Sequence, residues 1–357
     1  MRRDAFAISD KFGDERRTEI QDVEDEIDIE DLIEEEQCVY TLTHNGYIKR
    51  LPASEYRAQN RGGRGVKAMA TREEDYVETV FTASSHDYIL FFTSAGRVYR
   101  RKGYRIPEAG KNAKGTNIIN IIPTEPGERV QVMLHTREMD SGEYLNFVTR
   151  EGIVKRMALD ELKNIKNVGI RALAMDEGDE LVSVMLTDGA SKLLLATRKG
   201  AAICFDENDA RSMGRTARGV RGIHLREDDC VVGAGAVTEG GYVLSVTENG
   251  FGKRTEVEEY FRGGEGQKRG GYGMRNYNLT DKTGFVAAVK IVDGSEDILM
   301  VSDDGVIIRT DVGAISVYSR STKGVRVMRL NEGAKLISIA AAEKEPDEEA
   351  APEVPEA

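Results

Sequence analysis

The sequence lacks several features that mark common classes of protein. It has no tryptophan, and only 6% of its residues are aromatic. No apolar run approaches the ~20 residues that a membrane-spanning helix requires. The first residues, MRRDAFAISDKFGDERR, include two early arginines but no apolar segment of a signal peptide. The sequence therefore predicts a folded protein with neither a membrane span nor a secretion signal.

Cysteine and histidine are also scarce. Cys38, Cys204 and Cys230 are scattered and odd in number, which indicates reduced cytoplasmic thiols and not a disulfide framework. The four histidines, at positions 44, 86, 135 and 224, lie far apart along the chain. No group of these residues has the spacing of metal ligands, so we expect no metal site and structural roles for these side chains.

The charge is unevenly distributed along the chain. The net charge of −12 argues at first against nucleic-acid binding. However, residues 19–36 contain eleven acids and no base, and residues 343–357 contain seven acids, one base and three prolines. The remaining body, 37–342, has 40 acidic and 44 basic residues. Acidic blocks are usually solvated, and we expect 343–357 to be disordered. A sharper hypothesis is that this tail competes with an anionic ligand for the basic body.

Six similar segments recur along the body. They are TLTHNGYIKR (41–50), FFTSAGRVYR (91–100), FVTREGIVKR (147–156), LATRKGAAIC (195–204), SVTENGFGKR (245–254) and MVSDDGVIIR (300–309). Their glycines, Gly46, Gly96, Gly152, Gly200, Gly250 and Gly305, are 50, 56, 48, 50 and 55 residues apart. Each segment predicts a β-hairpin whose turn needs a positive φ. The period fits a blade of four strands.

A second glycine, surrounded by basic residues, follows in each repeat. It lies 19 residues after the first in four repeats, 17 residues after it in the third, and within 270–273 in the fifth. The surrounding sequences are RGGRGVK, KNAKGT, KNVGIR, RTARGVR, QKRGGYGMR and STKGVR. Radial stacking of six such units would bring the basic strand ends and the basic loops to one rim, as a belt of positive charge.

A basic belt with few aromatic residues suits the backbone of duplex DNA. Phosphates are regularly spaced, and glycine lets backbone N–H groups approach them closely. Binding to single strands would need exposed aromatic rings for stacking. Sequence-specific reading would need an element with several base-contacting side chains, and no such helix is predicted. We therefore expect bent duplex DNA on a curved surface, bound largely without regard to sequence.

The chain resembles the C-terminal domain of the DNA gyrase A protein over nearly its whole length, from about Asp10 to Ile339. KFGDERRTEI (11–20) is similar to the segment that leaves the family's breakage–reunion core. The six repeats match the family's six-bladed β-pinwheel, an all-β, propeller-like disc. QNRGGRG (59–65) matches the seven-residue box of gyrases, with asparagine at position 60 where arginine is usual. QKRGGYG (267–273) resembles a degraded second copy.

The resemblance implies a division of the chain and a mechanism. Residues 1–36 would be the end of the core and an acidic linker, 37–342 the pinwheel, and 343–357 a tail. The disc would wrap DNA in a positive sense so that the complete bacterial, chromosome-associated enzyme introduces negative supercoils. Its partners would be duplex DNA, the core of the gyrase A protein, and the gyrase B protein. ATP, magnesium and the active-site tyrosine belong elsewhere in that enzyme, so this chain is expected to be non-catalytic and to bind no cofactor.

The expected DNA contacts come from the box, the loops and the strand ends. In and after the box they are Gln59, Asn60, Arg61, Gly62, Gly63, Arg64, Gly65 and Lys67. At the strand ends they are Lys49, Arg50, Arg100, Arg101, Lys155, Arg156, Lys253 and Arg254. In the other basic loops they are Lys111, Lys114, Arg171, Arg215, Arg218, Arg221, Lys268, Arg269, Lys323 and Arg326. An alternative for Arg61 and Arg64 is to brace the first blade against the last.

Other interpretations remain open from the sequence. The C-terminal domain of the topoisomerase IV A protein shares the blades but usually lacks an intact box. A protein-binding propeller would predict Trp-Asp blade signatures and no basic rim. An isolated DNA-architectural protein is a third possibility. NGFGKRT (249–255) resembles a nucleotide-binding loop only faintly and coincides with a hairpin turn. Asp303 and Asp304 are expected to form a turn and not an acid–base pair.

Overall fold

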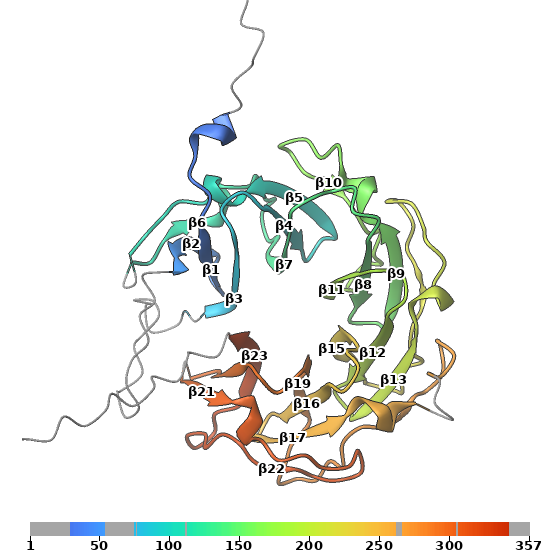
Figure 1. Cartoon of the computed structure of the whole chain (residues 1–357). Coiled ribbons are helices and arrows are strands. Elements are labelled where there is room, and N and C mark those ends of the chain that lie inside the picture. Colours follow the sequence, from blue (N-terminus) through green and yellow to red (C-terminus); the bar gives the residue numbers. More distant parts are fainter. Residues whose placement is uncertain are drawn as a thin grey trace, which may run out of the picture. The chain divides into compact units, whose positions relative to one another are not determined.

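The computed structural model describes residues 29–53, 75, 77–110, 113–261, 266–304 and 306–342 (Figure 1). The chain divides into two compact units, residues 1–34 and 35–357. The described part of the first unit holds a short 3-10 helix, η1 (Ile29–Leu32). All of the described strands belong to the second unit. The box at 59–65, Lys67, Lys111 and the acidic tail at 343–357 lie outside the described residues.

Six β-hairpins form the centres of the blades, at the predicted positions. They are β1 (Gln37–Thr43) with β2 (Tyr47–Pro52), β4 (Tyr88–Thr93) with β5 (Arg97–Lys102), β8 (Tyr144–Thr149) with β9 (Ile153–Ala158), β12 (Lys192–Thr197) with β13 (Ala201–Asp206), β16 (Tyr242–Thr247) with β17 (Phe251–Glu256), and β20 (Asp297–Ser302) with β21 (Ile307–Asp311). NGFGKRT contains the turn between β16 and β17, as expected, and Asp303 and Asp304 lie in the turn after β20.

The hairpin turns explain why a threonine stands three residues before the repeat glycine. In the first hairpin the Gly46 N–H donates to the Thr43 carbonyl at 2.9 Å, and the next N–H donates to the Thr43 hydroxyl at 3.1 Å. The same pair of bonds closes the turns that follow Thr93, Thr149, Thr197 and Thr247. Gly46 has φ of 78°, which residues with a Cβ seldom adopt. The predicted role of these glycines is confirmed wherever the turn is described.

Each of the first five blades is completed by strands from two successive repeats. The inner strand follows its own hairpin in the chain, whereas the short outer strand comes from the next repeat. The inner strands are β3 (Val77–Ser84), β7 (Val130–Thr136), β11 (Leu181–Thr187), β15 (Val231–Ala236), β19 (Val286–Val292) and β23 (Leu336–Ala342). The outer strands are β6 (Thr116–Asn117), β10 (Ile170–Arg171), β14 (Val220–Arg221), β18 (Met274–Arg275) and β22 (Val325–Arg326). This exchange places the outer strands of the second to sixth repeats on the preceding blades.

The inner strands of the second unit follow one another around a common centre (Figure 1). Each contacts the inner strands of the blades before and after it, and β23 contacts β3. The first five sheets have four strands, and the described part of the sixth has three: β21, β20 and β23. Short 3-10 helices follow the hairpins or the outer strands: η3 (Gly103–Arg105), η4 (Ile118–Asn120), η5 (Leu159–Leu162), η6 (Glu207–Asp209), η7 (Val257–Tyr260) and η8 (Val312–Ala314). The all-β, six-bladed architecture predicted from the repeats is confirmed.

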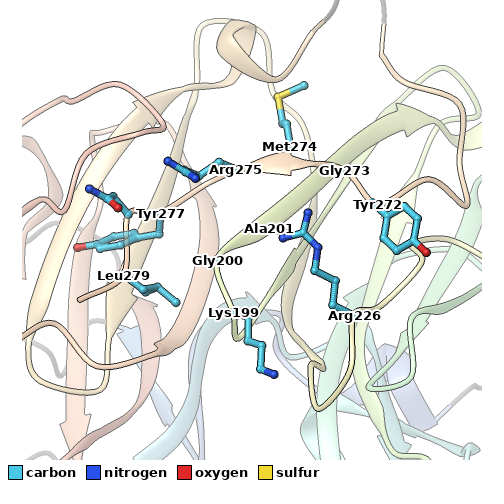
Figure 2. Close-up of a pocket in the computed structure, with 11 residues that line it drawn as sticks. Lys199, Gly200, Ala201, Arg226, Tyr272, Gly273, Met274, Arg275, Tyr277 and Leu279 are labelled. Atoms are coloured by element: carbon cyan, nitrogen blue, oxygen red, sulfur yellow. The ribbon is translucent and has the colours of Figure 1, made fainter. Parts of the chain in front are cut away.

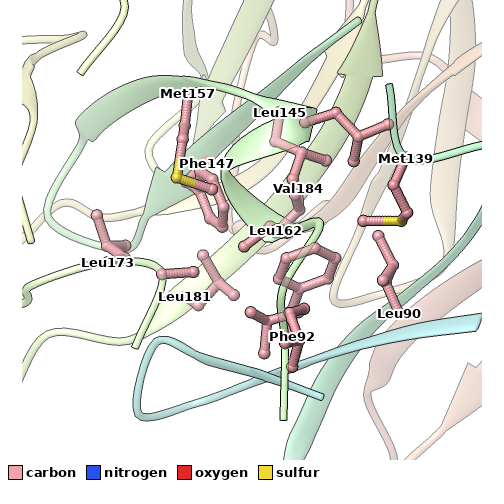
Figure 3. Packing of buried hydrophobic residues seen from close by; sticks show 14 residues of the cluster. Leu90, Phe92, Met139, Leu145, Phe147, Met157, Leu162, Leu173, Leu181 and Val184 are labelled. Carbon is pink, nitrogen blue, oxygen red and sulfur yellow. The ribbon is translucent and has the colours of Figure 1, made fainter. Parts of the chain in front are cut away.

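The hydrophobic core lies between successive blades. Five separate clusters of buried side chains fill the spaces between blades 1 and 2, 2 and 3, 3 and 4, 4 and 5, and 5 and 6. Figure 3 shows the second of these, where Phe92 of β4 meets Phe147 of β8 edge to face, with ring centroids 5.6 Å apart. Such pairs fix the angle between neighbouring sheets as well as burying area. No helix among the described residues is long and apolar enough to cross a membrane.

Candidate nucleic-acid interface

An exposed arginine occupies the same position on four consecutive blades. Arg171, Arg221, Arg275 and Arg326 are each the second residue of an outer strand and stand two residues after the loop glycine. Each pairs in register with the first residue of the hairpin's second strand. No carboxylate of the described residues forms an ion pair with these guanidinium groups. The outer edges of blades 2–5 therefore carry an ordered row of available positive charge.

The residue before the loop glycine adds cations on blades 1, 3 and 5. Lys114 extends over the ring of Tyr47, with its amine 3.5 Å from the ring centroid. Arg218 is paired with Asp176, and Lys323 is exposed. The loops also carry Arg215, which lies 3.7 Å from Glu161 across the surface. These predicted loop cations thus lie at the outer edges, beside the row of arginines.

The three lysines near the hairpin ends, Lys49, Lys155 and Lys253, have an internal role. All three side chains are completely buried. The Lys155 amine donates to the carbonyls of Ala172 and Arg215 at 2.5 and 2.6 Å, and the Lys253 amine donates to those of Ser319 and Arg320, both at 2.7 Å.

Lys49 makes the same kind of contact with the carbonyls of Gly110 and Ala113, at 3.0 and 3.2 Å. Burial lowers the pKa of all three amines, to about 8 for Lys155 and about 7 for Lys253. These lysines hold the next repeat's basic loop against the blade, and we leave them out of the proposed interface.

The arginines that follow these lysines are also bound to the protein. Arg156 donates to the buried carboxylate of Glu207, with Nε and Oε2 3.1 Å apart. Arg254 donates to two loop carbonyls and stacks 4.8 Å from the ring of Tyr242. Arg50 donates to Glu36 at 2.9 Å. These side chains position η6, η8 and the entry to β1, so the hairpin arginines of blades 1, 3 and 5 stabilise the blades.

The second blade differs, because its hairpin has Arg100 and Arg101 at the corresponding end. Arg100 is partly exposed and donates to the Lys163 carbonyl at 2.9 Å, and Arg101 donates to the Ile121 carbonyl at 2.9 Å. Burial lowers the pKa of Arg101. In the fifth repeat's loop, Lys268 is 92% exposed beside Asp209, whereas Arg269 donates to the carbonyls of Asp209 and Arg221. Lys268 is available to a ligand, and Arg269 shapes the loop.

A pocket of about 350 Å³ lies at the outer edge of blade 4. Figure 2 shows Lys199, Arg226, Tyr272 and Arg275 around the hairpin turn that leads into Ala201. The other described hairpins have a larger residue at the corresponding first position of the second strand: Tyr47, Arg97, Ile153 or Phe251. The pocket exists because alanine leaves that space open. Three cationic side chains, Lys199, Arg226 and Arg275, line it, which suits an anion.

Sequence reasoning missed Arg275, Arg226 and Lys199. The signal for Arg275 was present, because it stands two residues after Gly273 just as Arg171 stands two residues after Gly169. The fifth repeat has several glycines between 270 and 273, and only the structure identifies Gly273 as the one before the outer strand. Within the described ranges, no group of three or more His, Cys, Asp or Glu side chains could hold a metal ion.

Comparison with known proteins decides the family. The family model of the DNA gyrase C-terminal domain, a β-propeller, matches six successive segments: residues 39–84, 87–134, 143–188, 191–238, 241–293 and 296–343. The chain belongs to this family. The matched segments coincide with the six repeats, and together they cover most of the sequence. The resemblance on which the sequence interpretation rested is confirmed.

Curated relatives and solved structures agree with this assignment. The chain is 46% identical to the DNA gyrase A protein of Staphylococcus epidermidis over 355 residues, covering 97% of the chain and 39% of the relative. The DNA gyrase A protein of Staphylococcus aureus is also 46% identical, over 360 residues. The chain thus spans about two-fifths of the length of these relatives.

Two solved structures have the same fold over most of the chain. A DNA gyrase A C-terminal domain covers 86% of the chain with a TM-score of 0.71 and 27% identity, and 99% of that domain is matched. A C-terminal domain of DNA topoisomerase IV covers 87% with a TM-score of 0.72 and 26% identity, and 94% of it is matched. The fold alone therefore does not separate the two subfamilies, whereas the identity to the gyrase A proteins favours gyrase.

Proposed function

We propose that this gyrase C-terminal domain binds duplex DNA and wraps it around the outer edges of its blades. The observation that carries the proposal is the exposed arginine repeated on blades 2–5, at Arg171, Arg221, Arg275 and Arg326. A row of cations on successive outer edges suits a backbone that carries a charge at every phosphate, and a ligand that follows such a curved row must bend. The strand exchange fixes the arginines by backbone pairing, so the row is preorganised.

The proposed role is non-catalytic and belongs to a larger enzyme. Strand breakage and ATP hydrolysis, with its magnesium, would be carried out by the rest of the gyrase A protein and by the gyrase B protein in the bacterial cytoplasm. Wrapping would set the sign of the DNA crossing presented to that core and so direct it to negative supercoiling. Arg61, Arg64 and the rest of the box lie outside the described residues, and their part in the wrap is proposed from the resemblance alone.

A topology assay tests the proposal. The protein is incubated with nicked circular DNA, the nick is sealed with ligase, and the linking number is read after the protein is removed. We expect a stoichiometric positive shift for the wild type. The shift should fall sharply when Arg171, Arg221, Arg275 and Arg326 are all changed to Ala, and also in the Arg61→Ala plus Arg64→Ala variant.

A control of equal charge removes four exposed cations from loops and turns outside the row instead, by changing Arg129, Arg150, Lys282 and Lys335 to Ala. If the two quadruple variants behave alike, the effect is one of net charge and the outer row is not the binding surface. Salt dependence gives a second readout, because each lost phosphate contact lowers the slope of log K against log[salt] by about 0.9. Loss of the four outer arginines should reduce that slope by about 3 to 4, and the control should change it little.

Tight, salt-sensitive binding without a change in linking number would indicate a DNA tether that does not wrap, as expected for the topoisomerase IV interpretation. The structural similarity to a topoisomerase IV domain makes this the second candidate. Absence of DNA binding at low salt would exclude both and would leave a protein-binding propeller.

A further inference from the structure

Two of the outer edges present an apolar side chain where the others present a cation. The residue directly before the loop glycine is Lys114, Arg218 or Lys323 on blades 1, 3 and 5, but Val168 on blade 2 and Tyr272 on blade 4. Val168 is 62% exposed and Tyr272 is 54% exposed. A surface that only neutralised phosphates would gain nothing from these two residues.

Val168 is held in a rigid loop with its side chain exposed. The Val168 carbonyl accepts a hydrogen bond from Arg97 at 3.1 Å, and the preceding carbonyl accepts one from Arg101 at 3.3 Å. Gly169 packs so closely on the ring of Tyr99 that a Cβ there would lie 2.5 Å from a ring atom. The loop backbone is therefore fixed by β5, and the valine side chain is presented and not collapsed onto the blade.

Tyr272 is also oriented by its surroundings. Its ring centroid lies 4.3 Å from that of His224, with the two planes inclined at 50°. Gly273 beside it approaches the Ala202 carbonyl so closely that a Cβ would lie 2.3 Å from the oxygen. Tyr272 also borders the pocket next to Ala201, together with Arg275 (Figure 2). The ring thus stands at the edge of a space lined by cations.

Each apolar residue has an outer-strand arginine three positions later: Arg171 after Val168, and Arg275 after Tyr272. Proteins that bend DNA from the minor groove insert apolar side chains between base steps, while nearby cations contact the groove and backbone. The two residues stand singly on different blades, so they do not form the contiguous apolar patch of a protein-docking site.

We propose that Val168 and Tyr272 are wedges that press into the minor groove of the wrapped duplex at alternate blades. The inference rests on the proposed DNA wrapping and adds a sequence preference to it. Pyrimidine–purine steps unstack most easily, so DNA with such steps at the wedges should wrap most readily. The pocket beside Ala201 would take a phosphate displaced by the kink at Tyr272.

The test compares two duplexes of equal length and composition, one with TA steps phased at the helical repeat and one with the same bases rearranged to remove them. We expect the wild type to bind the TA-phased duplex about 3- to 10-fold more tightly. The Val168→Ala plus Tyr272→Ala variant keeps every charge, so it should lose this preference and keep the salt slope. 2-Aminopurine placed at a TA step should brighten with the wild type and stay quenched with this variant.

The matched variant, Lys114→Ala plus Lys323→Ala, changes the same loop position on two other blades. It should lower the salt slope by about 2 and keep the TA preference. The wedge proposal is overturned if the wild type shows no preference, or if the Val168→Ala plus Tyr272→Ala variant retains it. If the protein does not bind DNA at all, neither duplex will bind in a salt-dependent way. That result would refute DNA wrapping and not the wedge proposal alone. Because both wedge side chains are more than half exposed, an unchanged Tm is expected for this variant and confirms folding.

Discussion

Glu207 is the most completely buried acid in the described blades, and its environment shows how a charged residue is tolerated there. Its carboxylate accepts hydrogen bonds from Arg156 at 3.1 Å, Thr187 at 2.6 Å and the Ser191 N–H at 2.8 Å. These partners come from blades 3 and 4, so the carboxylate joins two neighbouring sheets. A buried ion of this kind is stable only because its oxygens are bonded to donors.

Glu207→Ala should therefore destabilise the protein by about 3–5 kcal/mol, since it leaves the Arg156 charge buried and unpaired. Urea unfolding measures this loss. Glu161→Ala is the matched control, because its carboxylate pairs with Arg215 only across the surface, at 3.7 Å. That change should be within about 1 kcal/mol of the wild type. Equal effects of the two substitutions would contradict an internal role for Glu207.

Lys253 gives a prediction about pH. Its amine has two carbonyl acceptors, which even a neutral amine can satisfy with its two hydrogens. Burial lowers its pKa to about 7, from an ordinary value of 10.5. Between pH 7 and about 10 the unfolded chain therefore holds more protons at this group than the folded chain does, so its contribution to stability rises with pH.

We expect Lys253→Met to be destabilised by about 1–3 kcal/mol, because two loop carbonyls lose their donor. The stability difference from the wild type should widen between about pH 7 and pH 9.5. Urea midpoints measured at pH 7 and pH 9.5 give this difference in stability. Lys155 is present in both proteins, so its titration changes both stabilities equally and does not affect the difference. A difference that does not vary with pH would show that the amine titrates normally in the folded state.

At the scale of the secondary-structure element, the hairpin turn closely approaches the segment that follows the outer strand. Gly96 has φ of 70°, and a Cβ at this position would lie 2.6 Å from the Leu173 carbonyl of the next repeat. The carbonyl of Gly96 in turn receives the N–H groups of Ala172 and Leu173. Gly96 therefore closes the hairpin turn and also leaves room for the neighbouring repeat to dock against the turn.

Gly96→Ala should cost about 2–4 kcal/mol, from strain at positive φ together with displacement of the loop that follows β10. Gly127→Ala separates these two effects, because Gly127 has φ of 84° but a Cβ added there would meet no atom within 4 Å. It should cost only about 1 kcal/mol. If thermal unfolding gives equal losses for both, the close approach to the next repeat contributes nothing.

These elements show what the sequence could and could not predict. The hairpins were predictable because Thr-x-x-Gly directly encodes a turn, and the repeat period indicated blades. The exchange of outer strands was not, because a period fixes the spacing of segments but not which neighbour each one pairs with. The burial of Lys155 was also hidden, since lysine is rarely buried and its carbonyl partners, at Ala172 and Arg215, are distant in sequence or belong to the next repeat.

At the scale of the whole second unit, the repeats are similar in backbone but alternate in chemistry. Blades 1, 3 and 5 have a buried lysine at the hairpin end and a cation before the loop glycine. At the position of the buried lysine, blades 2 and 4 have Tyr99 and Ile203. Before the loop glycine they have Val168 and Tyr272. A ligand that follows the rim meets these two kinds of edge in turn. The linking-number assay and the phased duplexes described above test this surface as a unit.

The strand exchange also has a consequence for how the protein is made. A ribosome releases the chain from the N-terminus at about 5–20 residues per second. The hairpin of one blade emerges well before the short strand that completes its outer edge, because that strand belongs to the following repeat. During synthesis each nascent blade therefore has an unpaired edge for several seconds, at the stage when a chain is most exposed to wrong partners. Because each described outer strand comes from the adjacent repeat, that interval stays short, and assembly can proceed one blade behind the ribosome.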